Sequence, residues 1–209
     1  MTLQDRLNLL LQLEGELTTK AHSVFRPLCI IECDFFVLGA LKRILANSHA
    51  FRLLIEAKIF PCAAAILRMQ LDTAMRLNGL TLAEDMHKCV TAVLNGEHFR
   101  QQRASSGDKM TDKFLHEKLA KQHAWVSSVY EETSDLVHLS GKQFYQSIAE
   151  LNDCDGTFSL QVSSTDKTMD EQAYYEVVDA FLDATKLAGL LVLGYLVSRC
   201  FPTNKADGA

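Results

Sequence analysis

Apolar residues recur at helical spacing along almost the whole chain, and this periodicity is the feature that most limits its fold. Leucines between Leu3 and Leu17 return every three or four residues and predict a helix over residues 3–24. The same pattern, often bounded by Pro, Gly or Asn, predicts further helices over 27–47, 49–57, 61–78, 83–95, 111–119, 123–139, 143–150 and 170–200. The sequence therefore predicts an all-α, multi-helix bundle.

One segment changes to a period of two residues. Phe158, Leu160 and Val162 alternate with polar residues, which is typical of a strand with one apolar face. A lone strand is not stable in water, so we expect a short strand or hairpin near residues 157–163. Its partner is either a nearby extended segment or the same strand of a second subunit.

The length of 209 residues fits one domain, expected over residues 1–202, with a disordered tail at 203–209. The net charge of −5 gives the chain no overall attraction for nucleic acid, although residues 100–121 are locally basic. The longest apolar run, 187–197, is shorter than the roughly 20 residues that a membrane span needs. With no signal peptide pattern and with its cysteines inside apolar helices, we expect a cytoplasmic protein with free thiols and no membrane contact.

The helix that carries Arg68 is the most informative one. It is apolar nearly all round and should be central, yet Arg68, Asp72 and Arg76 form a charged stripe along one face. Two arginines share one carboxylate there, so one guanidinium needs another anion. That anion is either a protein carboxylate, such as Glu32 or Asp34, or a ligand phosphate or carboxylate. The three residues are candidate ligand-binding residues, and the alternative is a purely structural ion network.

A later helix places Tyr130, Ser134 and His138 one above another. A phenol, a hydroxyl and an imidazole in a row can form a chain of hydrogen-bond donors and acceptors. Histidine titrates near neutral pH and is the usual acid–base residue. These three are candidate catalytic residues, and the alternative is a histidine held at the edge of the core by its neighbours.

Two carboxylate–histidine spacings resemble those of metal-binding bundles. Glu84 precedes His87 by three residues, and Asp135 precedes His138 by three, as in the Glu-x-x-His motifs of di-iron bundles. However, Glu84 stands at a helix start, where acidic residues are expected anyway, and Asp135 points away from the Tyr130 face. We therefore predict no metal and no cofactor.

These residues together resemble a known family. The pattern Arg68-x-x-x-Asp72, the segment Lys-Met-Thr-Asp at 109–112, and Tyr130-x-x-x-Ser134-x-x-x-His138-x-Ser140 are similar to uncharacterised bacterial HEPN-like helical proteins. The likeness covers roughly residues 27–200 as a pattern of helices and scattered residues.

The resemblance implies a helical bundle that dimerises and acts on RNA or a nucleotide. Many HEPN proteins are RNases, or partners of nucleotidyltransferases, in defence and toxin–antitoxin systems. RNase members carry an Arg-x4-6-His motif on a late helix, but here residues 131–133 are Glu, Glu and Thr. The chain has one Arg-x5-His match, from Arg43 to His49, on an early helix.

Two functions remain open on the sequence, which leaves undecided whether the chain is an enzyme. The first is a metal-independent RNase or another RNA- or nucleotide-directed HEPN-like protein, with an antitoxin or nucleotidyltransferase as partner. The second is a non-enzymatic helical binding module whose Arg/Asp/His cluster is structural. In either case we expect a homodimer, because the strand edge and the apolar last helix both need cover.

Overall fold

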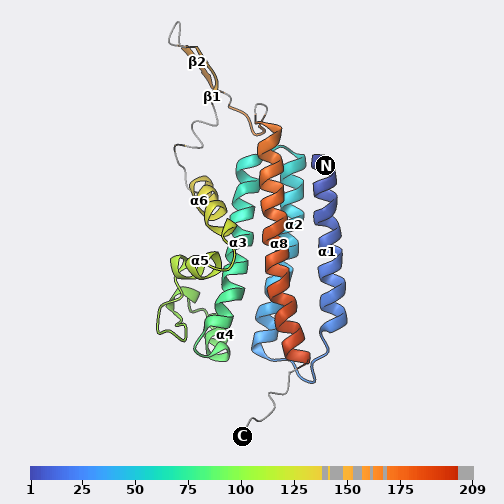
Figure 1. Cartoon of the computed structure of the whole chain (residues 1–209), viewed down its shortest axis with the longest axis vertical. Helices are drawn as coiled ribbons and strands as arrows, with labels where there is room; N and C mark the ends of the chain where they lie inside the picture. The colour runs from blue at the N-terminus through green and yellow to red at the C-terminus, as the bar shows by residue number, and fades with distance from the viewer. Residues whose placement is uncertain (138–140, 142–147, 153–156, 161, 167–168, 202–209) are drawn as a thin grey trace.

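Four long helices lie alongside one another in the computed structural model, which describes residues 1–137, 141, 148–152, 157–160, 162–166 and 169–201. They are α1 (Leu3–Val24), α2 (Glu32–Glu56), α3 (Phe60–Leu82) and α8 (Glu171–Cys200). The last helix, α8, contacts the other three, so residues from both ends of the chain share one core (Figure 1). The prediction of an all-α protein is confirmed.

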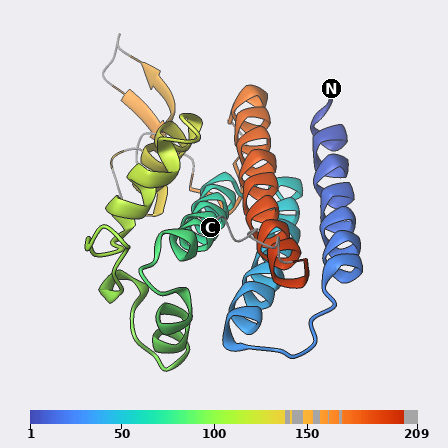
Figure 2. The same cartoon turned by 60° about the horizontal axis from the view of Figure 1, so that its bottom comes forward.

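The shorter helices pack around α3, on the side away from α1. They are α5 (Asp112–Ala120) and α6 (Trp125–Val137), which contact α3 and each other, and α4 (Met86–Leu94), which contacts α2 and α3. Figure 2 shows the same order from a second direction, with α3 between α6 and α8. A single 3-10 turn, η1 (Phe99–Gln101), lies in the segment between α4 and α5. Helix α3 is therefore the central helix, as its apolar character predicts.

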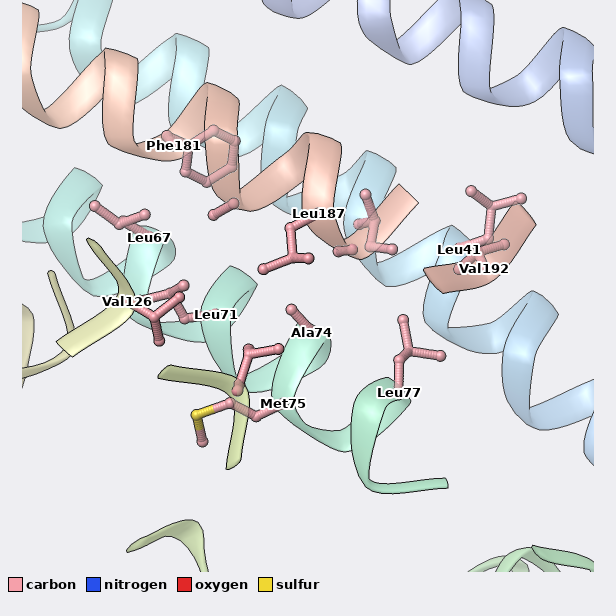
Figure 3. Close-up of a cluster of buried hydrophobic side chains, with 14 of the residues drawn as sticks. Leu41, Leu67, Leu71, Ala74, Met75, Leu77, Val126, Phe181, Leu187 and Val192 are labelled. Atoms are coloured by element: carbon pink, nitrogen blue, oxygen red, sulfur yellow. The ribbon is translucent and has the colours of Figure 1, made fainter. Parts of the chain in front are cut away.

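The part of the core that surrounds α3 lies between α8 on one side and α6 on the other. Leu67 and Leu71 of α3 face Phe181 of α8, and Val126 of α6 closes the other side (Figure 3). The Phe181 ring also stacks on Phe51 of α2, with ring centroids 3.9 Å apart. Such close apolar packing fixes how α3 is rotated about its axis. The rotation in turn decides where the polar residues of α3 point.

Three sequence-based helix boundaries are wrong. The helix expected from residue 27 begins only at Glu32, where the Asp34 side chain accepts a hydrogen bond from the Ile31 amide at the helix start. A break was expected near Asn47 and Ser48, but α2 continues through both because their side chains bond to other helices, Asn47 to Gln70 at 3.0 Å and Ser48 to Glu14 at 2.7 Å. Gly79 was expected to stop α3, which instead runs on to Leu82. A Cβ atom at Gly79 would lie 2.8 Å from the Leu115 side chain. This glycine therefore allows α5 to approach α3 closely.

Two short antiparallel strands lie beyond the upper end of the bundle in Figure 1, β1 (Ile148–Asn152) and β2 (Thr157–Leu160). The segment expected to be a strand, 157–163, overlaps β2. A helix was expected over 143–150, but residues 148–150 belong to β1, so that assignment is wrong for them. Residues 143–147 lie outside the described part of the chain, as does the expected tail at 203–209.

The surface of α8 is partly apolar. Within the described residues it is the one helix that is long and apolar enough to cross a membrane by length and composition, and half of its most apolar window is buried inside the bundle. Leu190 and Val197 are exposed, seven residues apart on this helix. Helix α8 therefore packs one side into the bundle and leaves part of its apolar surface exposed.

Candidate functional site

The charged stripe predicted on α3 is present, and each of its members is half-buried. Asp72 pairs with Arg76 one turn further along α3 and with Arg43 of α2, at 3.7 Å between Oδ2 and Nη2. Arg76 also donates to Asp112, the first residue of α5, at 3.2 Å. Arg43 and Asp112 thus join Arg68, Asp72 and Arg76, and we call these five residues the charged ladder.

Arg68 is the member of the charged ladder that no carboxylate holds among the residues described. Its guanidinium carbon lies 3.8 Å from the centre of the Tyr130 ring, a cation–π contact. The ladder has three guanidinium groups and two carboxylates, which leaves one positive charge in excess. Burial lowers the pKa of Arg76 against the opposite effect of Asp112, and the nearby Arg43 and Arg68 lower it further.

The second carboxylate of the ladder is Asp112, whereas the sequence suggested Glu32 or Asp34. Asp34 is fully buried at another place, between α2 and α8. It accepts a hydrogen bond from the Tyr195 hydroxyl at 2.8 Å and lies 3.3 Å from Arg199. This part of the expectation is wrong because α2 meets α8, and not α3, at the position of Asp34.

Tyr130 contacts two side chains through its ring. The His116 ring stacks on it with ring centroids 4.3 Å apart, and the Arg68 guanidinium lies over the ring. Nε2 of His116 is buried and has no hydrogen-bond partner among the described residues. Sequence reasoning missed His116, although it follows Asp112 by one helical turn. Thr111 sets that turn by accepting a hydrogen bond from the Phe114 amide as the helix N-cap.

The expected chain from Tyr130 through Ser134 to His138 is only partly described. The Ser134 hydroxyl donates to the backbone carbonyl of Tyr130 at 2.6 Å rather than to the phenol. Its oxygen lone pairs remain able to accept a further hydrogen bond. His138 lies outside the described residues, so its role continues to rest on the sequence.

A hollow of about 370 Å³ opens beside the charged ladder, and we call it the polar hollow. Four helices contribute to it: α2, α3, α5 and α6. It brings together four of the predicted site residues, whereas Arg76 reaches it only through its ion pairs. Its lining is formed by Arg43, Ala65, Arg68, Met69, Asp72, Asp112, Tyr130, Ser134 and Val137.

The two metal-like spacings do not assemble into a ligand set in the described part of the chain, where no three His, Cys, Asp or Glu side chains are grouped to hold an ion. Asp85, next to Glu84, caps α4 by accepting from the Lys88 amide. His87 lies with Nδ1 3.7 Å from the thiol sulfur of Cys33. Glu84 and His87 are both exposed, and the helix start is capped by Asp85 rather than by the carboxylate of the motif.

No protein-family model, curated protein or solved structure matches this chain. Its function must therefore be argued from the site itself. The site has one positive charge in excess, and Arg68, which belongs to the charged ladder, also lines the polar hollow.

Proposed function

We propose that this chain is a HEPN-like helical protein that binds the phosphate groups of RNA or a nucleotide in the polar hollow. The observation that carries the proposal is Arg68, a half-buried guanidinium at the hollow with no carboxylate partner among the described residues. A guanidinium group presents planar, paired donors that match a phosphate group. A phosphate at Arg68 would balance the one positive charge left over in the ladder.

The HEPN-like part of the proposal is supported by which residues meet at the hollow. The likeness rests on three separate segments of the sequence, and members of all three line this one hollow: Arg68 and Asp72, then Asp112, then Tyr130 and Ser134. Residues that are up to 66 positions apart in the chain thus share one site. If the three segments serve one function, their residues must meet at one site, and they do so at the polar hollow.

In its catalytic form the proposal assigns one role to each group. Arg68 holds the phosphate and stabilises the negative charge that develops on it, and His138 acts as general acid or base. Tyr130 orients Arg68 through the cation–π contact, and Ser134 offers a hydrogen-bond acceptor.

The ribose 2′-hydroxyl attacks the adjacent phosphorus, which forms a 2′,3′-cyclic phosphate and breaks the bond to the 5′-oxygen of the next nucleotide. A base takes the proton of the 2′-hydroxyl and an acid gives one to the leaving 5′-oxygen. Because this needs only acid–base help and charge stabilisation, we expect cleavage of RNA to continue when divalent metal is chelated.

Binding and cleavage are tested separately. Fluorescence anisotropy with a labelled RNA oligonucleotide should show tight binding by the wild type and a loss of at least about tenfold for Arg68→Gln, because a charge-assisted contact of roughly 1.5–3 kcal/mol is removed. Arg26→Gln is the matched control, since Arg26 is an exposed arginine at the end of α1 and the charge change is the same. Equal losses in both variants would contradict the site.

Cleavage is tested by incubating a mixed RNA pool with the protein in the presence of a chelator. We expect fragments with the wild type and none with His138→Ala. Binding without cleavage in the wild type would reject the RNase role and keep the phosphate-binding role.

The proposal extends to the assembly and partners of the protein. We propose a cytoplasmic homodimer that works with an antitoxin or nucleotidyltransferase, and the exposed Leu190 and Val197 of α8 favour an interface on that helix. Light scattering should give a mass of twice 23.4 kDa. A mass of one chain at micromolar concentration would reject the dimer.

The second candidate function is a non-enzymatic interaction module in which the ladder is structural. The observation that favours it is Asp72, which is paired twice, with Arg43 and Arg76. This alternative predicts that Asp72 matters for stability and that Arg68→Gln has no effect on any phosphate ligand. Phosphate-dependent stabilisation of the wild type separates the two functions.

A further inference from the structure

A second hollow lies directly beside the polar hollow and differs from it in chemistry. It has a volume of about 340 Å³ and lies between α2, α3 and α4. The two hollows share Arg43 and Asp72, so the ion pair between these residues forms the boundary between them. Apart from the ladder residues and Thr73, the lining is apolar: Phe35, Phe36, Gly39, Ala40, Leu77 and Leu94. We call this second space the apolar hollow.

The aromatic side chains of the two hollows are not equally available to a ligand. The ring of Tyr130 in the polar hollow already stacks with His116 and carries the Arg68 guanidinium. Phe36 packs against Phe99, with ring centroids 6.4 Å apart. Phe35, in contrast, is 62% exposed at the edge of the apolar hollow. A flat ring that enters this space therefore meets Phe35.

We infer that the apolar hollow is a nucleobase subsite, which takes the base of the nucleotide whose phosphate Arg68 binds. This inference rests on the proposed function and names its ligand class, a nucleotide unit rather than an isolated anion. An exposed aromatic ring beside an apolar wall suits base stacking, which tolerates any base. The polar hollow, which contains the Arg68 guanidinium, and the apolar hollow share a wall. Together they match the phosphate and the base of one nucleotide.

The spacing along α3 agrees with one nucleotide unit. The α3 residues of the polar hollow run from Ala65 to Asp72, and those of the apolar hollow run from Asp72 to Leu77. The centres of these two stretches are about six residues apart, which is roughly 9 Å at the rise of an α-helix. Each hollow is at the lower end of the range of roughly 300–1,000 Å³ for small-ligand pockets. Base and phosphate of one nucleotide can therefore occupy neighbouring hollows.

Gly39 makes the apolar hollow accessible to a specific test. A Cβ atom added at this glycine would have no atom within 4 Å, so the space above it is open. Because Gly39 lines the hollow, a leucine at position 39 is expected to fill part of it, and its Cβ atom meets no neighbour. Because glycine is a poor helix former, Gly39→Leu should also leave α2 at least as stable as before. Gly15 of α1 has the same open surroundings and gives the matched control, Gly15→Leu.

The experiment is calorimetric titration with adenosine 5′-monophosphate and with ribose 5-phosphate, which has the same phosphate but no base. We expect the wild type to bind the mononucleotide at least about fivefold more tightly, from base stacking. Gly39→Leu and Phe35→Ala should remove this difference and leave the affinity for ribose 5-phosphate unchanged. Gly15→Leu should behave as the wild type.

The possible results separate a failure of the base subsite from a failure of the proposed phosphate site. If the wild type binds neither compound, the proposed phosphate site itself is rejected. If it binds both equally, or if Gly39→Leu leaves the preference for the mononucleotide intact, the base subsite is rejected and the phosphate site stands. Binding of octyl phosphate as tight as that of the mononucleotide would also overturn the base subsite, in favour of an alkyl chain in the apolar hollow.

Discussion

Opposite faces of α3 carry two polar clusters that differ in how completely their groups are paired. On one face Gln70 is fully buried, and its side-chain amide accepts a hydrogen bond from Asn47 and donates to Thr185, both at 3.0 Å. Thr185 in turn donates to the backbone carbonyl of Phe181. On the other face the charged ladder is half-buried, and Arg68 has no carboxylate partner among the described residues.

The difference indicates which cluster is structural and which one is open to a ligand. A buried polar group is costly unless it is hydrogen-bonded, and the Gln70 cluster meets this condition with groups of the protein alone. The ladder keeps water contact and one surplus positive charge, so an anion can still bind to it with a gain in free energy. Four predictions test this contrast, in order of decreasing effect on the stability of the protein without ligand.

The largest effect is expected for Gln70→Ala. The change opens a cavity, removes the acceptor of the Asn47 amide and takes away the hydrogen bond that the Thr185 hydroxyl accepts, so we expect a loss of roughly 3–5 kcal/mol in the free energy of unfolding. Urea denaturation measures it. Gln12→Ala, at an exposed glutamine of α1, is the control and should change stability by less than about 0.5 kcal/mol. Comparable small losses in both variants would show that the Gln70 cluster is not structural.

Asp72→Asn should have an intermediate effect of about 1–2 kcal/mol. It leaves Arg43 and Arg76 without their shared carboxylate, but the Asp72 side chain is 22% exposed and that of Arg43 is 47% exposed. Water can therefore screen part of the repulsion, which in a fully buried pair would cost about 3–5 kcal/mol. Thermal or urea unfolding measures the loss, with Asp183→Asn on the surface of α8 as control. A loss of 3 kcal/mol or more would favour the structural alternative.

Arg68→Gln should change stability by less than about 1 kcal/mol, since it removes one cation–π contact and no ion pair with a described residue. Its main effect should be on ligand-dependent stability. Adenosine 5′-monophosphate at a hundred times its dissociation constant should stabilise the wild type by about 2.7 kcal/mol and the variant much less. Thermal unfolding with and without the nucleotide measures this. Equal stabilisation of both proteins would place the ligand elsewhere.

The smallest effect concerns salt. Between about 0.01 M and 1 M salt the Debye length falls from roughly 30 Å to 3 Å, so repulsion among the ladder arginines is screened. The stability cost of Asp72→Asn should therefore shrink by a few tenths of a kcal/mol, while that of Gln70→Ala stays constant because amides carry no charge. Urea denaturation of both variants at the two salt concentrations checks this. If the stability cost of both substitutions changed by the same amount with salt, the two clusters would not differ in their dependence on charge.

The charged ladder shows how far sequence reasoning reaches at the site. Helical spacing alone places Arg68, Asp72 and Arg76 on one face, and charge counting predicts that one guanidinium needs a further anion, from the protein or from a ligand. The structure shows the shared face and gives Arg76 a second carboxylate, Asp112, while Arg68 has none among the described residues. Sequence reasoning could not find the partners on other helices, Arg43 and Asp112, which are 29 or more residues from Asp72 in the chain. A contact of that kind has no signal in local spacing.

The sequence by itself determined the all-α class, the bounds of α1 at Leu3–Val24, the end of α8 at Cys200 and the central position of α3. These follow from the 3.6-residue period of apolar residues, which is a property of neighbouring residues. Only the tertiary structure decided that α2 continues past Asn47, that Gly79 lies inside α3, and that an apolar hollow adjoins the polar one. The physical reason is that packing between helices supplies the hydrogen-bond partners, close contacts and open spaces that local preferences leave undefined.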